Sequence, residues 1–314
     1  MAAAEPTLAA LPSAPLRYLL ATRPAFLSVT LGACLIGLGS AYAAGVPILA
    51  WKALVTIVFA MAAHAGANVL NDYYDSMSGN DAGNTDRIFP FTGGSRFIQN
   101  GVLSEAATAR FGMALFAATV AAGLWLMTVS APGLFFFGLA GVFIGIAYSA
   151  PPLSLNSRGW GEACIWAAWC VIAAGTDYVQ RAAPSPLPWL AAAGYALLVT
   201  NVLFINQFPD RRADERVGKR HWVVRLGPDR ASRAYLAIAI AAYLFPLAGV
   251  AAGALPATTL IVLVALPLSL DAAGQLRRHR DEVSRLGPAI QKTIAATMAH
   301  GALMAAGLAA SRFV

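Results

Sequence analysis

The sequence predicts an all-α protein that crosses a membrane repeatedly, with about nine transmembrane helices. Of its 314 residues, 58% are hydrophobic and only 12% are charged, whereas soluble domains carry about 25% charged residues. The hydrophobic residues also fall into runs of about twenty, which is the length that a helix needs to cross a bilayer. Together these observations exclude an ordinary soluble domain.

Nine apolar runs account for the expected spans, and together they make one transmembrane domain over residues 25–314. The expected spans are 25–45, 52–74, 108–130, 132–150, 160–181, 187–209, 231–252, 255–274 and 288–311. Residues 1–24 are expected to form an N-terminal cytoplasmic or interfacial segment. They lack the charged start, apolar stretch and small-residue cleavage site of a signal peptide.

Positive charges gather in alternate loops, as the positive-inside rule expects of cytoplasmic loops. The two densest clusters contain Arg211, Arg212, Arg216, Lys219, Arg220, Arg225 and Arg230, then Arg277, Arg278, Arg280 and Arg285. With nine spans, this pattern places the N-terminus and the loops 75–107, 150–159, 210–230 and 275–287 in the cytoplasm, and the C-terminus outside. The net charge of +7 therefore reports topology in a cell (inner) membrane, and nucleic acid is not an expected partner.

The most informative stretch lies at the end of the second apolar run. There Asn68, Asn71, Asp72 and Asp75 interrupt a sequence that is otherwise apolar. On a helix with 3.6 residues per turn, these four residues fall within an arc of about 100°. Because polar residues inside a membrane segment are costly, such a patch indicates a functional site.

A second polar patch closes the sixth apolar run. Asp210 and Asp214 are i,i+4 neighbours on one helical face, with Asn206 one turn before them. The Asn-x-x-x-Asp spacing of Asn206 and Asp210 repeats that of Asn68 and Asp72 four spans earlier. Repeats of this kind in membrane proteins commonly place a site at the repeat interface, so we expect the two patches to face each other.

Carboxylate and carboxamide oxygens suit Mg²⁺, which is commonly held by one or two carboxylates together with substrate phosphates. We therefore predict a site for two Mg²⁺ ions that bridge a diphosphate. The predicted metal ligands are Asn68, Asp72, Asp75, Asn206, Asp210 and Asp214, and the four aspartates are also the predicted catalytic residues. The alternative is that these carboxylates only end helices and pair with nearby arginines.

The flanking loops supply groups that suit an anionic substrate. Residues 92–96 combine glycines, which let backbone N–H groups approach an anion, with a guanidinium. The basic residues after Asp214 can neutralise a leaving diphosphate, although anchoring to the cytoplasmic side explains them equally well. The predicted substrate-binding residues are Asn71, Arg87, Arg96, Tyr148, Lys219 and Arg220. For Tyr148, an interfacial aromatic anchor is the alternative.

The paired motifs resemble those of the UbiA superfamily of intramembrane prenyltransferases. The stretch 71–75, Asn-Asp-Tyr-Tyr-Asp, resembles the superfamily's Asn-Asp-x-x-Asp signature, and residues 210–214 resemble its Asp-x-x-x-Asp. Gly79 with Asp81, followed by residues 92–96, is most similar to the branch that prenylates 1,4-dihydroxy-2-naphthoate in menaquinone synthesis.

Two departures from that branch lie near the second motif. Residues 206–210 are Asn-Gln-Phe-Pro-Asp where the branch has Asn-Asn-x-Arg-Asp, and residues 221–222 are His-Trp where it has Thr-Leu. Both bear on the aromatic acceptor rather than on the type of reaction.

The resemblance implies a helical bundle around a central cavity that opens to the cytoplasmic side and to lipid. It implies an enzyme that transfers a polyprenyl group from a prenyl diphosphate, with Mg²⁺ as cofactor, to an aromatic quinone precursor, here 1,4-dihydroxy-2-naphthoate. A 4-hydroxybenzoate or other aromatic-acceptor prenyltransferase is the alternative within the superfamily. From another class, a cation-coupled transporter would place acidic residues deep within several spans.

Overall fold

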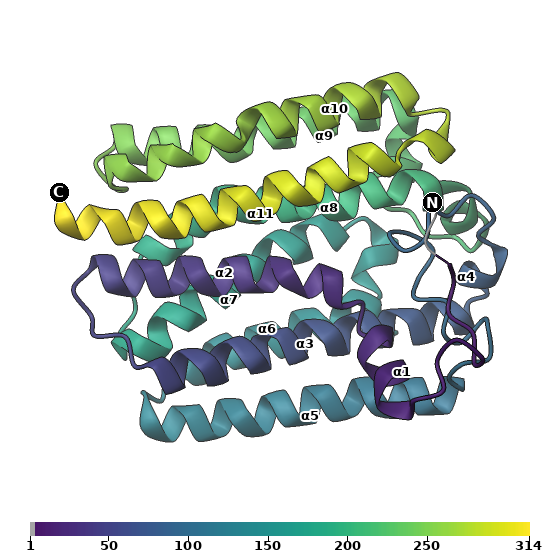
Figure 1. Cartoon of the computed structure of the whole chain (residues 1–314), viewed down its shortest axis with the longest axis horizontal. Helices are drawn as coiled ribbons and strands as arrows, with labels where there is room; N and C mark the ends of the chain where they lie inside the picture. The colour runs from purple at the N-terminus through teal and green to yellow at the C-terminus, as the bar shows by residue number, and fades with distance from the viewer. Residues whose placement is uncertain (1–3) are drawn as a thin grey trace.

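The computed structural model describes residues 4–314, and these residues form helices and loops without a β-strand. The elements are α1 (Ala14–Ala21), α2 (Pro24–Ala43), α3 (Ala50–Met77), α4 (Asn80–Gly83), α5 (Glu105–Val129), α6 (Leu134–Ser149), η1 (Leu155–Arg158), α7 (Gly161–Arg181), α8 (Leu187–Arg216), α9 (Trp222–Ala251), η2 (Ala257–Ala265), α10 (Leu266–His279), η3 (Val283–Arg285), α11 (Gly287–Ala310) and η4 (Ser311–Phe313). The long helices lie side by side along the longest axis of the molecule (Figure 1). The predicted all-α fold is confirmed.

Within residues 4–314, seven stretches of helix are long and apolar enough to cross a membrane. They are α2, α3, α5, α8, α9, η2 with α10, and α11. The predicted span 132–150 corresponds to α6, which has only 16 residues. The predicted span 160–181 corresponds to α7, which carries Glu162, Asp177 and Arg181. Neither helix is among these seven. Both pack against α3 in the same bundle. The chain is a multi-pass membrane protein, and the count of nine spans stays a prediction.

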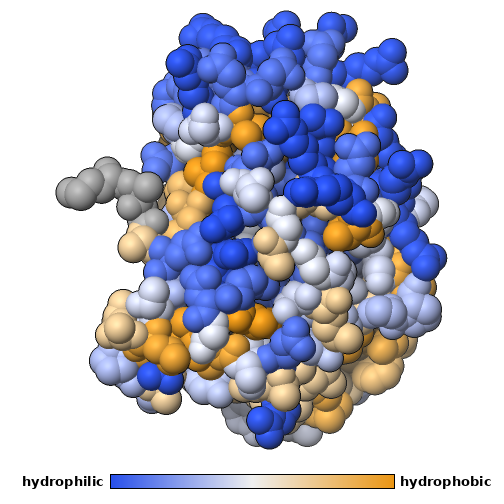
Figure 2. Space-filling model, turned by 90° about the vertical axis from the view of Figure 1, so that its right-hand side faces the viewer, coloured by the Kyte–Doolittle hydropathy of each residue, from blue (hydrophilic) through white to orange (hydrophobic). Residues whose placement is uncertain are grey.

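The loops that carry the basic clusters lie at one end of the bundle, together with α4 and the N-terminal segment, on the right in Figure 1. The C-terminus lies at the opposite end. Figure 2 looks onto this loop end, where hydrophilic residues dominate the surface and hydrophobic residues gather in its lower part. The long helices alternate in direction, and the loops rich in Arg and Lys all lie at the same end. This arrangement makes one end of the bundle basic. Which end faces the cytoplasm is still assigned from charge.

One predicted span, 255–274, is not a continuous α-helix. It consists of the 3₁₀ segment η2 followed directly by α10. Pro267 lacks an N–H, and its ring crowds the carbonyl one turn earlier, which disfavours regular α-helical hydrogen bonds in the turn before it. The N–H of Leu266 donates instead to the carbonyl of Leu263, three residues back.

Helix α8 lies at the centre of the bundle and packs against α2, α7, α9 and α11. Its fully buried Tyr195 donates from its hydroxyl to the carbonyl oxygen of Val29 in α2, at 2.5 Å. The ring occupies the space that side chains at Gly32 and Gly301 would fill. Small residues let membrane helices approach closely, and here they let one aromatic ring fix α8 between α2 and α11. This packing positions the acidic end of α8.

Gly37 lies where α2 and α7 are too close to leave room for a side chain, and it provides a test of the packing. A Cβ there would lie 2.3 Å from the carbonyl oxygen of Ala173 and 2.8 Å from the Cβ of Thr176. We expect Gly37→Ala to lower the free energy of unfolding by about 1–3 kcal/mol, the usual cost of overpacking. Thermal unfolding in detergent measures this as a lower Tm.

Gly274→Ala is the matched control, because nothing lies within 4 Å of a Cβ added in that helix. Helix propensity alone favours alanine over glycine by about 1 kcal/mol, so its Tm should be unchanged or slightly higher. Equal Tm changes in the two variants would contradict the close contact between α2 and α7.

Candidate active site

A cavity of about 170 Å³ lies beneath the loops, among the loop ends of α2, α3, α6, α7 and α8. Its lining changes with depth along α8. Asp210 and Asp214 line the part near the loops, Asn206 and Gln207 follow one turn deeper, and Val199 lies deeper still. The cavity thus passes from a charged layer through a carboxamide layer to an apolar one.

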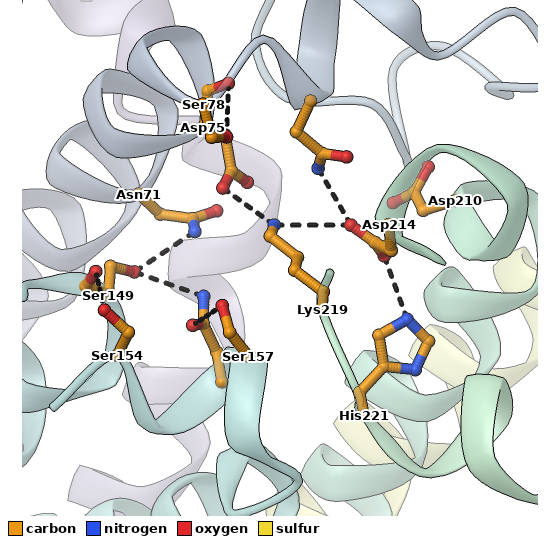
Figure 3. A network of polar contacts seen from close by, with 12 residues as sticks. Asn71, Asp75, Ser78, Ser149, Ser154, Ser157, Asp210, Asp214, Lys219 and His221 are labelled. Carbon is orange, nitrogen blue, oxygen red and sulfur yellow. Dashed lines mark hydrogen bonds and ion pairs between the residues drawn. The ribbon is translucent and has the colours of Figure 1, made fainter. Parts of the chain in front are cut away.

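The two predicted acidic motifs meet across Lys219, which follows α8. Its Nζ lies 2.7 Å from Oδ1 of Asp75 on α3 and 3.3 Å from Oδ1 of Asp214 on α8. Figure 3 shows the lysine reaching between the two carboxylates, with Asp210 beside them. The prediction that the two patches face each other agrees with this geometry.

The short helix α4 and the residue after it bring two carboxamides to the second motif. Asn80 donates from Nδ2 to Oδ1 of Asp214 at 2.8 Å, and Asn84 donates from Nδ2 to Oδ1 of Asp210 at 2.6 Å. Gly79, with a φ of +73°, begins this turn in the left-handed region that favours glycine. The long loop after α3 therefore folds back onto α8 and orients both of its aspartates.

His221 holds the other oxygen of Asp214. Its Nε2 lies 2.9 Å from Oδ2 of Asp214, and its Nδ1 accepts a hydrogen bond from the backbone N–H of Val224 at 3.4 Å. Because Nδ1 acts as an acceptor, the ring proton lies on Nε2 and is donated to Asp214. This one residue therefore orients a site carboxylate and caps α9.

The glycine loop packs directly against the first motif. The backbone N–H of Ser95 donates to both carboxylate oxygens of Asp72, at 3.3 and 3.2 Å. Gly94 has a φ of +73°, and a Cβ there would lie 2.4 Å from Oδ2 of Asp81. Only glycine allows this approach. The N–H of Ser95 thus meets a carboxylate of the protein, whereas the sequence predicted N–H groups free for an anionic substrate.

Negative charge exceeds positive charge in this cluster. Burial lowers the pKa of Lys219, but the carboxylates of Asp75 and Asp214 raise it more, so its pKa lies above the usual lysine value. Burial raises the pKa of Asp81, and the carboxylates of Asp75 and Asp72 raise it further, to about 8. The cluster therefore favours the arrival of additional positive charge.

The donor set fits a hard divalent cation completed by a substrate. Several buried oxygens have no hydrogen-bond partner within the described part of the chain, namely Asn80 Oδ1, Asp81 Oδ2, Asn84 Oδ1 and Asn206 Oδ1. Among residues 4–314, no three His, Cys, Asp or Glu side chains converge on a point that would hold a metal ion. The carboxylates instead surround Lys219. Oxygen ligands from one or two carboxylates, completed by phosphate, are what Mg²⁺ prefers.

Most of the predicted site residues line this cavity. They are Asn68, Asn71, Asp75, Tyr148, Asn206, Asp210, Asp214 and Lys219. Asn71 is further held by Ser149, whose Oγ accepts from its Nδ2 at 3.1 Å. Asp72 is buried beside the cavity against Ser95, and Arg220 is exposed outside its wall.

Arg87 and Arg96 are bound by the N-terminal segment instead. The guanidinium of Arg87 lies 2.6 Å from Oε1 of Glu5, and Nε of Arg96 lies 3.6 Å from Oε2. Burial raises the pKa of Glu5, but hydrogen bonds from Asn100 and Arg87 lower it more, so its pKa lies below the usual value. The carboxylate therefore stays charged at neutral pH. Both guanidinium groups also donate to backbone carbonyls of the loop, Arg87 to Asn84 at 2.6 Å and Arg96 to Asp81 at 2.5 Å. Neither arginine lines the cavity, so contact with a diphosphate there requires both side chains to move.

Arg23, Asn80, Asn84 and His221 are site residues that the sequence interpretation missed. Arg23 lines the cavity and donates from Nη2 to the carbonyl oxygen of Phe91 at 2.7 Å. In the sequence it is a single arginine just before the first apolar run, with no motif around it. The asparagines stand in a polar loop where nothing marks burial, and for His221 the only signal was its departure from the family pattern.

Two further polar residues of the long helices, His64 and Asp177, have partners within the bundle. His64 bonds through Nδ1 to the hydroxyl of Thr30 at 2.8 Å and meets the ring of Trp169 edge-on, at 5.0 Å between centroids. Asp177 accepts two hydrogen bonds from Arg181, each at 2.7 Å. His64 thus packs in the wall of the cavity, and Asp177 forms an ion pair near the other end of the bundle.

A second cavity, of about 300 Å³, lies among α3, α5, α6 and α7. Its walls are almost wholly apolar and include Phe59, Ala63, Phe137 and Val171. Ala63 directly precedes His64, which lines the first cavity, so the two cavities approach each other along α3.

Comparison with known proteins gives consistent matches. The model of the UbiA prenyltransferase family matches residues 30–287. The chain is 31% identical to a 1,4-dihydroxy-2-naphthoate octaprenyltransferase of Mycobacterium tuberculosis, over 73% of this chain and 76% of that protein. It is 27% identical to the protein of the same name from Escherichia coli, over 94% and 96%. The solved structure of a UbiA homolog from Archaeoglobus fulgidus bound to GPP and Mg²⁺ has the same fold, with a TM-score of 0.62 at 17% identity, covering 92% of this chain and 99% of that one.

Removal of the bridging cation tests the electrostatics of the cluster. Lys219→Met keeps the length of the side chain but leaves Asp75 and Asp214 without their shared ammonium. Breaking a buried ion pair in this way costs about 3–5 kcal/mol, so we expect a clearly lower Tm in detergent with EDTA. Lys292→Met removes an exposed pair with Asp271 and should leave the Tm nearly unchanged. Similar Tm values for the two variants would contradict the bridging role of Lys219.

Proposed function

The chain belongs to the UbiA prenyltransferase family, and on that premise we propose that it transfers a polyprenyl group from a prenyl diphosphate to 1,4-dihydroxy-2-naphthoate. The observation that carries this proposal is the meeting of two acidic motifs across Lys219, in a cavity that becomes apolar with depth. The names of the similar proteins from M. tuberculosis and E. coli support the acceptor. The family is one of enzymes, so the alternative of a cation-coupled transporter is not supported.

The acidic cluster is the proposed site of the diphosphate and of two Mg²⁺ ions. The residues that would hold the ions are Asn68, Asp72, Asp75, Asn206, Asp210 and Asp214. The unpartnered oxygens and the excess of negative charge support this assignment, as does the homolog from A. fulgidus, which was solved bound to GPP and Mg²⁺. When bound, Mg²⁺ neutralises charge that develops on a departing diphosphate.

Basic residues around the cluster offset the charge of the leaving group. Lys219 stands between the motifs within reach of a phosphate placed there, and Arg23 adds a second positive charge on the wall. Fixed charges in a site shielded from water stabilise such a developing charge strongly. In our proposal Arg87 and Arg96 join them when Glu5 releases them. Arg220, which is exposed, is the least supported of the predicted substrate contacts.

The layers below the carboxylates suit the prenyl chain. When the C–O bond of the allylic diphosphate breaks, the positive charge remains on the prenyl carbon. Phe26, Tyr148 and Trp169 line the cavity, and aromatic rings can stabilise such a cation through their π faces. The electron-rich ring of the acceptor then forms the new C–C bond and loses a proton. The apolar second cavity is the proposed place for part of the polyprenyl tail.

The proposed location is the inner membrane, with the loop end and the N-terminus in the cytoplasm and the C-terminus outside. This orientation rests on the basic clusters that gather at the loop end. It gives the acidic cluster access to a water-soluble diphosphate head from the cytoplasm.

An acceptor panel tests the proposed function. The purified protein in detergent, supplied with Mg²⁺ and a polyprenyl diphosphate, should prenylate 1,4-dihydroxy-2-naphthoate and should not prenylate 4-hydroxybenzoate at a comparable rate. Product formation is followed by chromatography and mass spectrometry. Transfer only to 4-hydroxybenzoate would overturn the acceptor assignment and leave the reaction type intact.

Substitution in each motif tests the metal–diphosphate assignment. We expect Asp72→Ala and Asp210→Ala each to lower Mg²⁺-dependent prenyl transfer by at least about 100-fold, because each removes charge that positions and stabilises the leaving group. Membrane insertion should be unaffected. Asp271→Ala, at an exposed carboxylate paired with Lys292, is the control and should retain turnover. Wild-type rates in either motif variant would overturn the two-metal assignment.

A further inference from the structure

Gln207 lines the first cavity and carries a carbonyl oxygen without a hydrogen-bond partner among the described residues. Its side chain is more than nine-tenths buried, and the residue lines the cavity. Its Nε2 donates to Oε1 of Glu162, at 3.0 Å. Its Oε1 is buried and has no hydrogen-bond partner in the part of the chain that the structure describes.

Glu162 determines which way this amide points. The opposite orientation of the amide would place two oxygens about 3.0 Å apart, which is unfavourable next to a carboxylate. Glu162 lies in the first turn of α7 and is itself buried, and its Oε2 has no partner among residues 4–314. The pair therefore leaves two oxygens without a partner, and of these two residues only Gln207 lines the cavity.

Gln207 lies in the carboxamide layer of the cavity, deeper than the carboxylates of Asp210 and Asp214. It precedes Asp210 by three residues, which is about 4.5 Å along the axis of α8. Asn71, Tyr148 and Asn156 line the cavity together with it. A molecule that attacks the carbon next to the diphosphate must lie below the carboxylates, and the carboxamide layer occupies that depth.

The chemistry of the unpartnered oxygen selects the ligand group. Toward an organic molecule a carbonyl oxygen acts only as a hydrogen-bond acceptor, so Gln207 Oε1 pairs with an O–H or N–H donor and not with a carboxylate or a phosphate. A buried acceptor that stays unpaired costs about 1–3 kcal/mol, and a ligand that carries a hydroxyl at this position recovers it. An aromatic acceptor with phenolic hydroxyls supplies such a donor.

We propose that Gln207 accepts a hydrogen bond from a hydroxyl group of the aromatic acceptor and thereby selects hydroxylated rings, while Glu162 positions its amide. This inference rests on the proposed function, because it assumes an aromatic acceptor in this cavity. It also assigns a role to one of the departures from the family pattern, the glutamine at position 207.

The test measures how strongly the protein distinguishes between ligands that carry or lack a given ring hydroxyl. With the wild-type protein, 1-hydroxy-2-naphthoate and 4-hydroxy-2-naphthoate are measured as competitive inhibitors against 1,4-dihydroxy-2-naphthoate. We expect the analogue that lacks the recognised hydroxyl to bind at least 10-fold more weakly than the other. Gln207→Met should erase that difference and raise the KM for the acceptor at least 10-fold, with the KM for the prenyl diphosphate unchanged. A Gln207→Met enzyme that keeps the discrimination would overturn the proposal.

Glu162→Gln provides a second variant whose shape is nearly unchanged. It removes the carboxylate that orients the amide of Gln207. The difference in affinity between the two analogues should therefore become smaller without vanishing, while the KM for the prenyl diphosphate stays the same. Full discrimination in Glu162→Gln would overturn the positioning role.

Asn201→Leu is the matched control. Asn201 lies on the same helix and also has a buried, unpartnered carbonyl oxygen, but it does not line the cavity. It should therefore change the Tm without changing hydroxyl discrimination, and a loss of discrimination in this variant would show that Gln207 has no special role.

The wild-type measurement separates the two proposals. If the wild-type protein prenylates only 4-hydroxybenzoate, the acceptor assignment fails, and the same variants are compared with 4-hydroxybenzoate against benzoate as the analogue without a hydroxyl. Discrimination lost in Gln207→Met under those conditions would still support the role of Gln207. Discrimination retained there would overturn it.

Discussion

The contact of Lys219 with Asp75 and Asp214 is the interaction on which the site depends. These two carboxylates end helices from opposite halves of the chain, and without a shared cation they would repel each other in a buried position. An isolated buried charge is so costly that it must be paired. The lysine therefore holds α3 and α8 at a fixed separation, and it does so at the place where a cation–diphosphate complex is expected to enter.

Much of the surrounding structure serves to orient the same carboxylates. The loop after α3 returns through α4 so that Asn80 and Asn84 reach the aspartates of α8. His221 caps α9 and holds Asp214 at the same time. These partners leave other oxygens of the cluster unpaired. A site prepared for a divalent cation and a phosphate has this character, with ligands held in place but not saturated.

The membrane setting explains why the cavity is layered. Charged groups are tolerated where loops cover them at the end of the bundle, and toward the middle the lining of α8 changes from carboxylates to carboxamides and then to valine and leucine. A prenyl diphosphate has the same sequence of properties along its length. The close helix packing around Tyr195 keeps this arrangement rigid, because α8 cannot shift without displacing that ring from its place against Gly32 and Gly301.

The helical membrane fold, the two acidic motifs and their gathering at one end could be predicted from the sequence, because hydrophobic length and helical spacing are local properties of the chain. The sequence also predicted that Lys219 belongs to the site. How the groups pair became known from the folded structure alone. It placed Glu5 on Arg87 and Arg96, turned the N–H of Ser95 toward Asp72, and brought Glu162 behind Gln207. These contacts join residues from separate segments of the chain, and no local pattern specifies which distant partner a buried polar group will find.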